Sequence, residues 1–498
     1  MKRFLCVFTV FMASALVFAK APAEQAESDA GQESSVSSKY VKKEKVWPNS
    51  KRPAAATSEQ IASSKDKNPL NATESYEEDT REIFTYGMTE EIGNLLDSLT
   101  SDEDYRFKEE AYDLFQETKS QKIREKILAY FAMTKDPCLE DFAVETLNDP
   151  FEQRHDTVVA CFKYVSAVKS SDAIAAVVEL LEKDDLGYFN EALDCLGEIG
   201  GDEEALYLTE YLSKDDLTTA QRQSLIKVLG KIHADDTWDI LAEIAQDEDE
   251  DVYVRSYAAE AIGSMGRKEA VDILVDLFED ENPKLREYVV RGLSNFTDPI
   301  VQTVIKQALK DDVWRVRMEA INVIEKHGIT SLSKDLIYHC KHKEETVVKE
   351  KIYKVLAKLN TAEGNEYLVS LITDKKTGDG IKSKVAAALL ENNTAGVQEI
   401  IELAKETLKN DKQKNLRYAL GKEFAKYNRS EFGEICSLYL ASKDVATQGT
   451  GLDMYARGKY SSATQAVQDL ASLAEETPDG KKPANNANAL KAKKILGN

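Results

Sequence analysis

The amino-acid sequence predicts an all-α protein, an α-α superhelix of the HEAT/armadillo-like solenoid class with about 11–12 stacked helical hairpins. Three observations favour this fold class. A helical pattern of apolar residues returns about every 33 residues over most of the chain. A second helical segment lies in each interval between two copies. Glycine and proline number only 23 and 10 among 498 residues, and alternating strand-like segments bounded by turn pairs are not evident.

The first helix of the repeated hairpin is clearest in DVYVRSYAAEAIGSMG, residues 251–266. With Arg255 as an anchor, apolar or small residues follow three, four, seven and ten positions later, which places them on one face of a helix. The same spacing recurs at ten anchors separated by 31 to 35 residues: Arg124, His155, Phe189, Arg222, Arg255, Arg286, Arg317, Lys349, Lys382 and Arg417. The tenth position is an exception after Arg317, where it is His327, and is not matched after Lys382. The copies at Arg124 and His155 are weaker.

Helix boundaries and second helices follow from local chemistry. Polar residues that can accept from free N–H groups precede three first helices as N-caps, namely Asp251, Asn282 and Asp312. Glycines that tolerate positive φ are expected to end helices at Gly200, Gly266 and Gly328. Second helices are predicted at 237–245, 270–278 and 299–309, and a divergent front hairpin at 89–99 and 105–116. We expect the anchor arginines to pair with acidic turns of neighbouring repeats and so form a ladder.

The motif Val-Arg-x-x-Ala-x-x-Ala-Ile-Gly at residues 254–263 resembles HEAT-like repeats of the short type also found in phycobilisome lyases. The best matches are Arg255, Ala258, Ala261, Ile262, Gly263 and Gly266. The resemblance covers roughly residues 89–473 and is strongest over 186–359. It implies the fold, and the amino-terminal segment favours an exported bacterial member of this repeat family. It carries no activity over, because such repeats serve scaffolds, adaptors and a few enzymes.

Four segments are expected along the chain. Residues 1–19 are predicted to be a signal peptide, since Lys2 and Arg3 precede an apolar run that ends at a small-residue cleavage site. An uncleaved anchor is the alternative. Residues 20–75 and 476–498 lack periodic apolar residues and are predicted to be a disordered linker and a disordered basic tail. Residues 76–475 form the repeat solenoid between them.

Charge and cysteine content restrict the possible partners and chemistry. The formal net charge of −23 disfavours nucleic acid, because affinity for phosphates comes from Lys and Arg. The leader favours a periplasmic or secreted bacterial protein without an integral membrane span after cleavage. Five cysteines remain beyond the leader, and an odd, scattered set indicates buried thiols better than a disulfide framework. Cys161 and Cys195 occupy equivalent positions of adjacent repeats and are expected to be core thiols.

Candidate metal and catalytic motifs are weak. Residues 247–251 begin like a calcium loop, but Val252 and Ala258 stand where an EF-hand needs glycine and glutamate. His339 and His342 can share a helical face, with His327 as the nearest further ligand, yet tight zinc binding needs three or four converging ligands. Common hydrolase, nucleotide-binding and metalloprotease motifs are absent. We therefore expect no catalytic residues, no metal and no cofactor.

One set of side chains is a candidate for contact with a protein partner: Tyr257, Tyr288, Trp314 and Arg315. Tyr257 and Tyr288 lie two positions after their anchors, away from the apolar stripe, and aromatic and Arg residues dominate binding hot spots. The competing interpretation is that these side chains fill the seams between repeats.

Together these observations favour a non-catalytic scaffold for protein binding or assembly in the bacterial cell envelope, with unknown protein partners and a possible envelope association. The alternative is a ligand-handling or lyase-type enzyme on the same frame. A base-excising glycosylase would need a basic concave face, which the acidic chain disfavours. A structural subunit of the envelope is a third possibility. A deep pocket with converging polar groups would favour the enzyme, and an open groove the scaffold.

Overall fold

The computed structural model describes residues 52–73, 75–151, 153–183, 187–214, 216–342, 344–392, 395–474 and 486–497. Contacts divide the chain into two units, Met1–Lys39 and Tyr40–Asn498, and every described residue belongs to the second unit. The predicted signal peptide lies outside the described residues. Within them all regular structure is helical, as the sequence predicts, and no helix is long and apolar enough to cross a bilayer.

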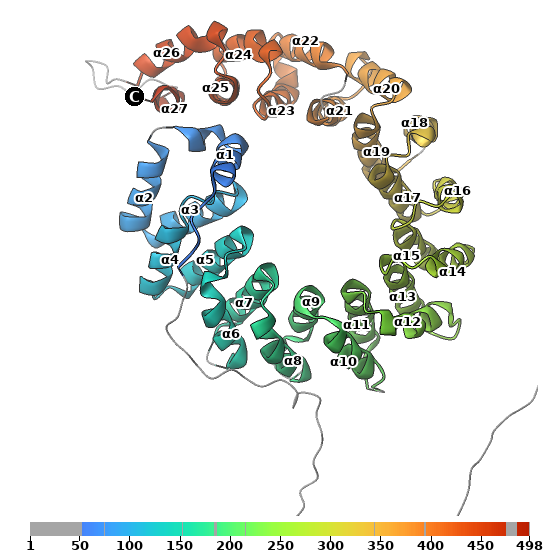
Figure 1. The fold of residues 1–498 in the computed structure, drawn as a ribbon. Helices are drawn as coiled ribbons and strands as arrows, with labels where there is room; N and C mark the ends of the chain where they lie inside the picture. Colours follow the sequence, from blue (N-terminus) through green and yellow to red (C-terminus); the bar gives the residue numbers. More distant parts are fainter. Residues whose placement is uncertain are drawn as a thin grey trace, which may run out of the picture. The chain divides into compact units, whose positions relative to one another are not determined.

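Two rows of helices build the repeat array (Figure 1). The inner row contains α5 (Gln121–Thr134), α7 (His155–Val168), α9 (Phe189–Ile199), α11 (Thr219–Ile232), α13 (Val252–Ser264), α15 (Pro283–Leu293), α17 (Trp314–His327), α19 (Thr346–Leu359), α21 (Asp379–Glu391), α23 (Lys414–Phe424), α25 (Val445–Gly458) and α27 (Asn486–Leu496). The outer row contains α6 (Glu140–Asn148), α8 (Ile174–Glu182), α10 (Asp202–Leu212), α12 (Trp238–Gln246), α14 (Glu269–Leu277), α16 (Pro299–Ala308), α18 (Ser333–Lys341), α20 (Ala362–Thr373), α22 (Val397–Leu408), α24 (Gly433–Leu440) and α26 (Thr464–Ser472).

The apolar stripe that defines the repeat forms the core. On α13, Ala258, Ala259 and Ile262 are completely buried, and the equivalent positions of α9, α11, α15, α17, α19, α21 and α23 are buried as well. In the weaker copy on α7, Val159 is only half-buried. Asp251 caps α13 by accepting from the N–H groups of Tyr253 and Val254, which confirms the predicted boundary. Each hairpin buries its stripe against the next, so no single repeat forms a core alone.

The inner row is packed more tightly than the outer row because small residues line its contacts. A Cβ atom at Gly263 of α13 would lie 2.4 Å from the Cα of Gly292 on α15. One at Gly230 of α11 would lie 2.5 Å from the Cβ of Ala261. Helix axes normally pass at about 8–10 Å, set by the side chains between them, so glycine and alanine bring the inner helices close together. The array therefore bends with the inner row on its short side.

The predicted arginine ladder is present in four successive repeats. The nitrogen–oxygen distances are 2.7 Å for Arg222–Glu250, 3.3 Å for Arg255–Asp280, 2.7 Å for Arg286–Asp311 and 2.5 Å for Arg317–Glu344. In each pair the carboxylate belongs to the turn that precedes the next anchor. Arg417 differs, because it pairs with Asp411 of its own turn at 3.7 Å.

Arg286 shows how an anchor joins two repeats. Its Nε and Nη2 donate to the two carboxylate oxygens of Asp311 at 2.7 and 3.1 Å. Its Nη1 donates to the carbonyls of Asp280 and Glu281, both at 2.9 Å. Bidentate arginine–carboxylate pairs are among the strongest hydrogen-bonded contacts in proteins. One guanidinium therefore holds its own turn and the next turn together.

We expect Arg286→Ala to lower the free energy of unfolding by about 1–2 kcal/mol, because the substitution leaves the half-buried Asp311 and two turn carbonyls without their donor. Circular dichroism should show a lower melting temperature and nearly unchanged helical content at room temperature. Lys306→Ala, at an exposed position of the outer row, is the control and should melt like the parent chain. An unchanged melting temperature for Arg286→Ala would refute the stabilising ladder.

Two predicted helix boundaries need correction. The N-cap of α17 is Val313, not Asp312, and Asp311 accepts from the Val313 N–H at 2.9 Å. Gly200 ends α9 with φ −74°, so positive φ is not the reason for glycine there. A Cβ at Gly200 would lie 2.6 Å from the Leu196 carbonyl oxygen. Gly266 and Gly328, with φ of +70° and +61°, follow the prediction.

The predicted disordered linker is wrong for its described part. Residues 58–67 form α1 (Ser58–Lys67), which a capping box between Thr57 and Gln60 begins, and η2 (Pro69–Ala72) follows. Polar contacts hold this segment: the Ala54 N–H donates to Asp136 at 2.9 Å, and the Ser64 hydroxyl donates to the Glu103 carbonyl at 2.7 Å. The front of the array continues with α2 (Tyr76–Tyr86), α3 (Thr89–Ser101) and α4 (Lys108–Glu117).

The predicted disordered tail is also wrong where the structure describes it. Residues 486–496 form α27, which packs on α25 and α26. Ala489, Ala492 and Ile495 are buried and spaced by three, so they make one face of the helix. The front and end of the array touch: Lys494 pairs with Asp79 of α2 at 3.2 Å, and Arg457 donates to the Asp66 carbonyl.

Candidate partner-binding face

Tyr257 and Tyr288 meet between α13 and α15. Their ring centroids lie 4.9 Å apart in an edge-to-face arrangement. Tyr288 is only 6% exposed, and the Lys284 Nζ and the Arg291 guanidinium carbon each lie 4.4 Å from its ring centroid. A hydrogen bond with Tyr288, followed by partial burial, raises the pKa of the half-buried Tyr257 phenol. Tyr288 therefore lies in the seam between two repeats, which is the competing interpretation of these side chains.

Trp314 and Arg315 lie together at the start of α17. The Arg315 guanidinium carbon is 4.8 Å from the centroid of the Trp314 ring, a cation–π distance. Trp314 is half-buried, whereas Arg315 is exposed. Tyr253, two positions before the Arg255 anchor, is 49% exposed, and the sequence pattern gave no sign of it. Contact of Tyr257, Trp314 and Arg315 with a partner stays a prediction.

Arg291 forms a charged cluster across three inner helices. It pairs with Glu260 of α13 at 3.4 Å, with Glu287 of its own helix at 3.2 Å and with Glu319 of α17 at 2.8 Å. Burial alone would lower the Arg291 pKa, but the hydrogen bond with Glu319 and the charges of Glu260 and Glu319 raise it above its ordinary value. The cluster joins α13, α15 and α17 on the same side as the Tyr257–Tyr288 contact.

A stripe of solvent-facing residues lies opposite the core stripe on α17, α19, α21 and α23, whereas α15 has no exposed residue. On α19 the stripe begins with the exposed Val347, two positions before the Lys349 anchor. It continues with the half-buried Lys351, two positions after the anchor, and with the exposed Lys354 and Lys358, five and nine positions after it. The helix packs on α17 and α21 at its sides and on α18 and α20 behind, so the stripe faces the free side of the inner row. The sequence template followed apolar positions alone and missed this surface, although lysine at the fifth and ninth positions signalled it.

Charge is divided between the two rows. The eight inner helices from α11 to α25 carry 20 Lys or Arg and 9 Asp or Glu. The eight outer helices from α10 to α24 carry 4 Lys or Arg and 16 Asp or Glu. The inner helices are thus basic within an acidic chain, although four of their arginines pair with carboxylates of the turns. The net charge of −23 therefore does not describe the charge along this row.

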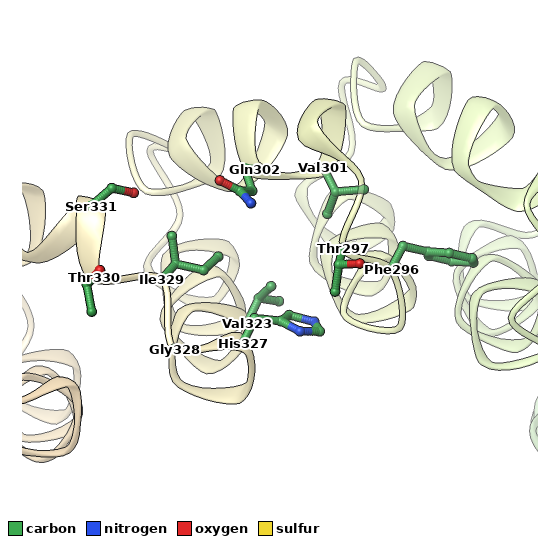
Figure 2. Close-up of a pocket in the computed structure, with 10 residues that line it drawn as sticks. All are labelled: Phe296, Thr297, Val301, Gln302, Val323, His327, Gly328, Ile329, Thr330 and Ser331. Carbon is green, nitrogen blue, oxygen red and sulfur yellow. The ribbon is translucent and has the colours of Figure 1, made fainter.

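A cavity of about 330 Å³ lies between the hairpins of α15–α16 and α17–α18. Figure 2 shows the His327 ring, at the end of α17, beside the loop that carries Phe296 and Thr297. Val301, Val323 and Ile329 supply apolar lining, and the His327 Nε2 lies 2.8 Å from the Ser294 carbonyl oxygen. The volume is at the lower end of the range for small-molecule pockets.

The family model described as spirochaete HEAT repeat protein matches residues 84–495. The chain belongs to this family. The match confirms the HEAT-like resemblance found in the repeat motif, and it extends through α27, beyond the predicted end of the solenoid at 475.

Several solved structures are distantly similar to this spirochaete HEAT repeat protein. The CpcE–CpcF phycocyanin lyase complex from Nostoc sp. PCC7120 is 18% identical, with 50% of this chain and 94% of that chain covered and a TM-score of 0.31. The karyopherin Kap121p bound to the extreme C-terminus of the protein phosphatase Cdc14p is 12% identical, with 88% of this chain and 54% of that chain covered and a TM-score of 0.39. Human deoxyhypusine hydroxylase in complex with glycerol is 16% identical, with 58% of this chain and 95% of that chain covered and a TM-score of 0.21. No curated protein sequence matches the chain.

The candidate metal ligands of this HEAT repeat protein do not converge. The His339 Nδ1 lies 3.1 Å from Glu344, which also pairs with Arg317. The His342 ring stacks on Tyr338 with centroids 3.9 Å apart. No group of three or more His, Cys, Asp or Glu among the described residues is placed to hold a metal ion.

Cys138, Cys161, Cys195, Cys340 and Cys436 are buried free thiols, as the sequence predicts. Burial raises the pKa of Cys161 and of Cys195 to about 12, so both remain neutral core groups at ordinary pH.

Proposed function

We propose that this spirochaete HEAT repeat protein is a non-catalytic scaffold of the cell envelope, periplasmic or secreted, that holds protein partners along its inner row. The observation that carries the proposal is the solvent-facing stripe that α17, α19, α21 and α23 share, which offers a long surface instead of a single enclosed site. Repeat arrays commonly use such extended faces for binding. The signal peptide predicted at residues 1–19 supports export.

Site-specific cross-linking in spirochaete cells tests this function. A photoreactive amino acid replaces Lys354 on the inner row or, as the matched control, Lys334 on the outer row; both side chains are exposed. We expect position 354 to give discrete cross-links to envelope proteins, and position 334 to give none of these products. The cross-linked chain should have been cleaved after Ala19. The proposal fails if both positions give the same products, or if the chain remains in the cytoplasm.

The alternative, a ligand-handling or lyase-type enzyme, is favoured by one observation, the cavity beside His327. Thr330 is exposed at its rim, so Thr330→Trp should close the cavity without disturbing the core. Two results together would favour the enzyme. A small molecule would co-purify with the parent chain but not with this variant, and position 354 would give no cross-links.

A further inference from the structure

Six cations lie on the exposed face of the inner row, and we call them the inner basic stripe: Arg315, Lys326, Lys354, Lys358, Lys422 and Lys426. They belong to α17, α19 and α23 and to the turn after α23. The arginine ladder does not include them, because its guanidinium groups point into the turns between repeats.

Carboxylates are too few on this face to neutralise the stripe. Glu325 serves two lysines, with Lys358 at 3.3 Å and Lys351 at 2.5 Å, and Glu423 pairs with Lys426 at 2.8 Å. Arg315, Lys354 and Lys422 have no carboxylate within ion-pair distance among the described residues. An excess of exposed positive charge therefore remains, although the chain as a whole is acidic.

Apolar side chains interrupt the cations. Val347 on α19 is 50% exposed and Ile381 on α21 is 39% exposed, near the starts of their helices. Ala387, at the position of α21 equivalent to Lys354, is half-exposed. A ligand that complements this face presents both acidic and apolar groups, which a polypeptide does and a phosphate backbone does not.

We propose that the inner basic stripe binds an extended acidic segment of a protein partner. The proposal rests on the scaffold function and names the chemistry of its partner. Inner helices about 8–10 Å apart and a strand rise of about 3.3 Å per residue give about three ligand residues per helix. The four helices from α17 to α23 thus match about twelve residues with an acidic side chain at roughly every third position. At physiological salt the Debye length is about 8 Å, so the acidic outer row is screened from this ligand.

Fluorescence anisotropy with the purified full chain tests the proposal. The probe is a labelled 12-residue peptide with Glu at every third position and Ser, Ala and Val between. Its comparison probes are the same peptide with Gln for Glu and a 12-nucleotide single-stranded DNA. The test variant is R315E/K354E/K422E. The control, K306E/K310E/K334E, makes the same change in net charge at exposed positions on or beside the outer row.

We expect the parent and the control to bind the acidic peptide with equal affinity, more weakly as salt rises, and the test variant to bind at least about tenfold more weakly. The affinity of the parent chain for the Gln peptide should be no higher than the affinity of the test variant for the acidic peptide. Absence of acidic-peptide binding, equal loss in the control, or tighter binding of the DNA would each overturn the proposal. If the peptide result fails while cross-links from position 354 persist, the scaffold function survives and only the acidic chemistry is wrong.

Discussion

Asp104→Ala should destabilise the front of the array by about 3–5 kcal/mol, because it leaves a buried arginine without its principal carboxylate. Asp104 is completely buried and accepts from the Arg106 Nη2 at 2.6 Å, the Arg106 Nε at 2.9 Å and the Tyr76 hydroxyl at 3.2 Å. The Arg106 side chain is only 4% exposed. After the substitution its remaining carboxylate is that of Glu77, 3.2 Å away and 42% exposed.

The effect of Asp104→Ala should be local, because each repeat contacts mainly its neighbours. Hydrogen exchange should accelerate in α1 to α4, while α13 to α19 keep the protection of the parent chain. Asp97→Ala is the matched control: Asp97 pairs with Lys126 at the surface, its side chain is 60% exposed, and its loss should cost less than about 1 kcal/mol. Equal exchange in the two variants would show that Asp104 does not hold the front hairpins together.

Gly263→Ala should destabilise the middle of the array by about 1–3 kcal/mol, although alanine is the better helix former by about 1 kcal/mol. The added methyl group would meet the Gly292 backbone at 2.4 Å, and a backbone cannot rotate away as a side chain does. The two inner helices must then separate, which disturbs the packed residues on either side. Thermal unfolding followed by circular dichroism should show the loss.

Gly93→Ala provides the matched control for Gly263→Ala. Gly93 is also buried within a helix, α3, but the nearest atom to an added Cβ is the Cε of Lys126 at 3.4 Å, an ordinary contact. The helix preference of alanine should therefore prevail, and the free energy of unfolding should rise by about 0.5–1 kcal/mol. If both alanine substitutions change the free energy of unfolding in the same direction, close packing of α13 against α15 is disproved.

Most of the fold follows from local sequence chemistry. The spacing of apolar residues after each anchor predicts which side of the helix is buried, and caps such as Asp251 set the boundaries. The helix α1 was missed because its order depends on contacts distant in sequence, for example Ser64 with the Glu103 carbonyl. The helix α27 was missed because its buried face uses Ala489 and Ala492, which a search for large apolar residues passes over.

The candidate site was less predictable than the fold. A helical wheel shows that Tyr288 lies outside the core stripe, but it does not show that the close approach of α13 and α15 covers this side chain. The basic inner row was hidden for a different reason. Total charge averages the two rows, and only the alternation of helices between them reveals that the positive charge is concentrated on one.

The glycine contacts of the inner row give the array unequal stiffness. At Gly263 and Gly292 the backbones already touch, so these two helices resist further approach and have little room to slide. The outer helices have fewer contacts with one another, and a bending load can widen or narrow the wedges between them at lower cost. We therefore expect bending of the array to open or close the outer row near α14 and α16, while α13 and α15 keep their separation.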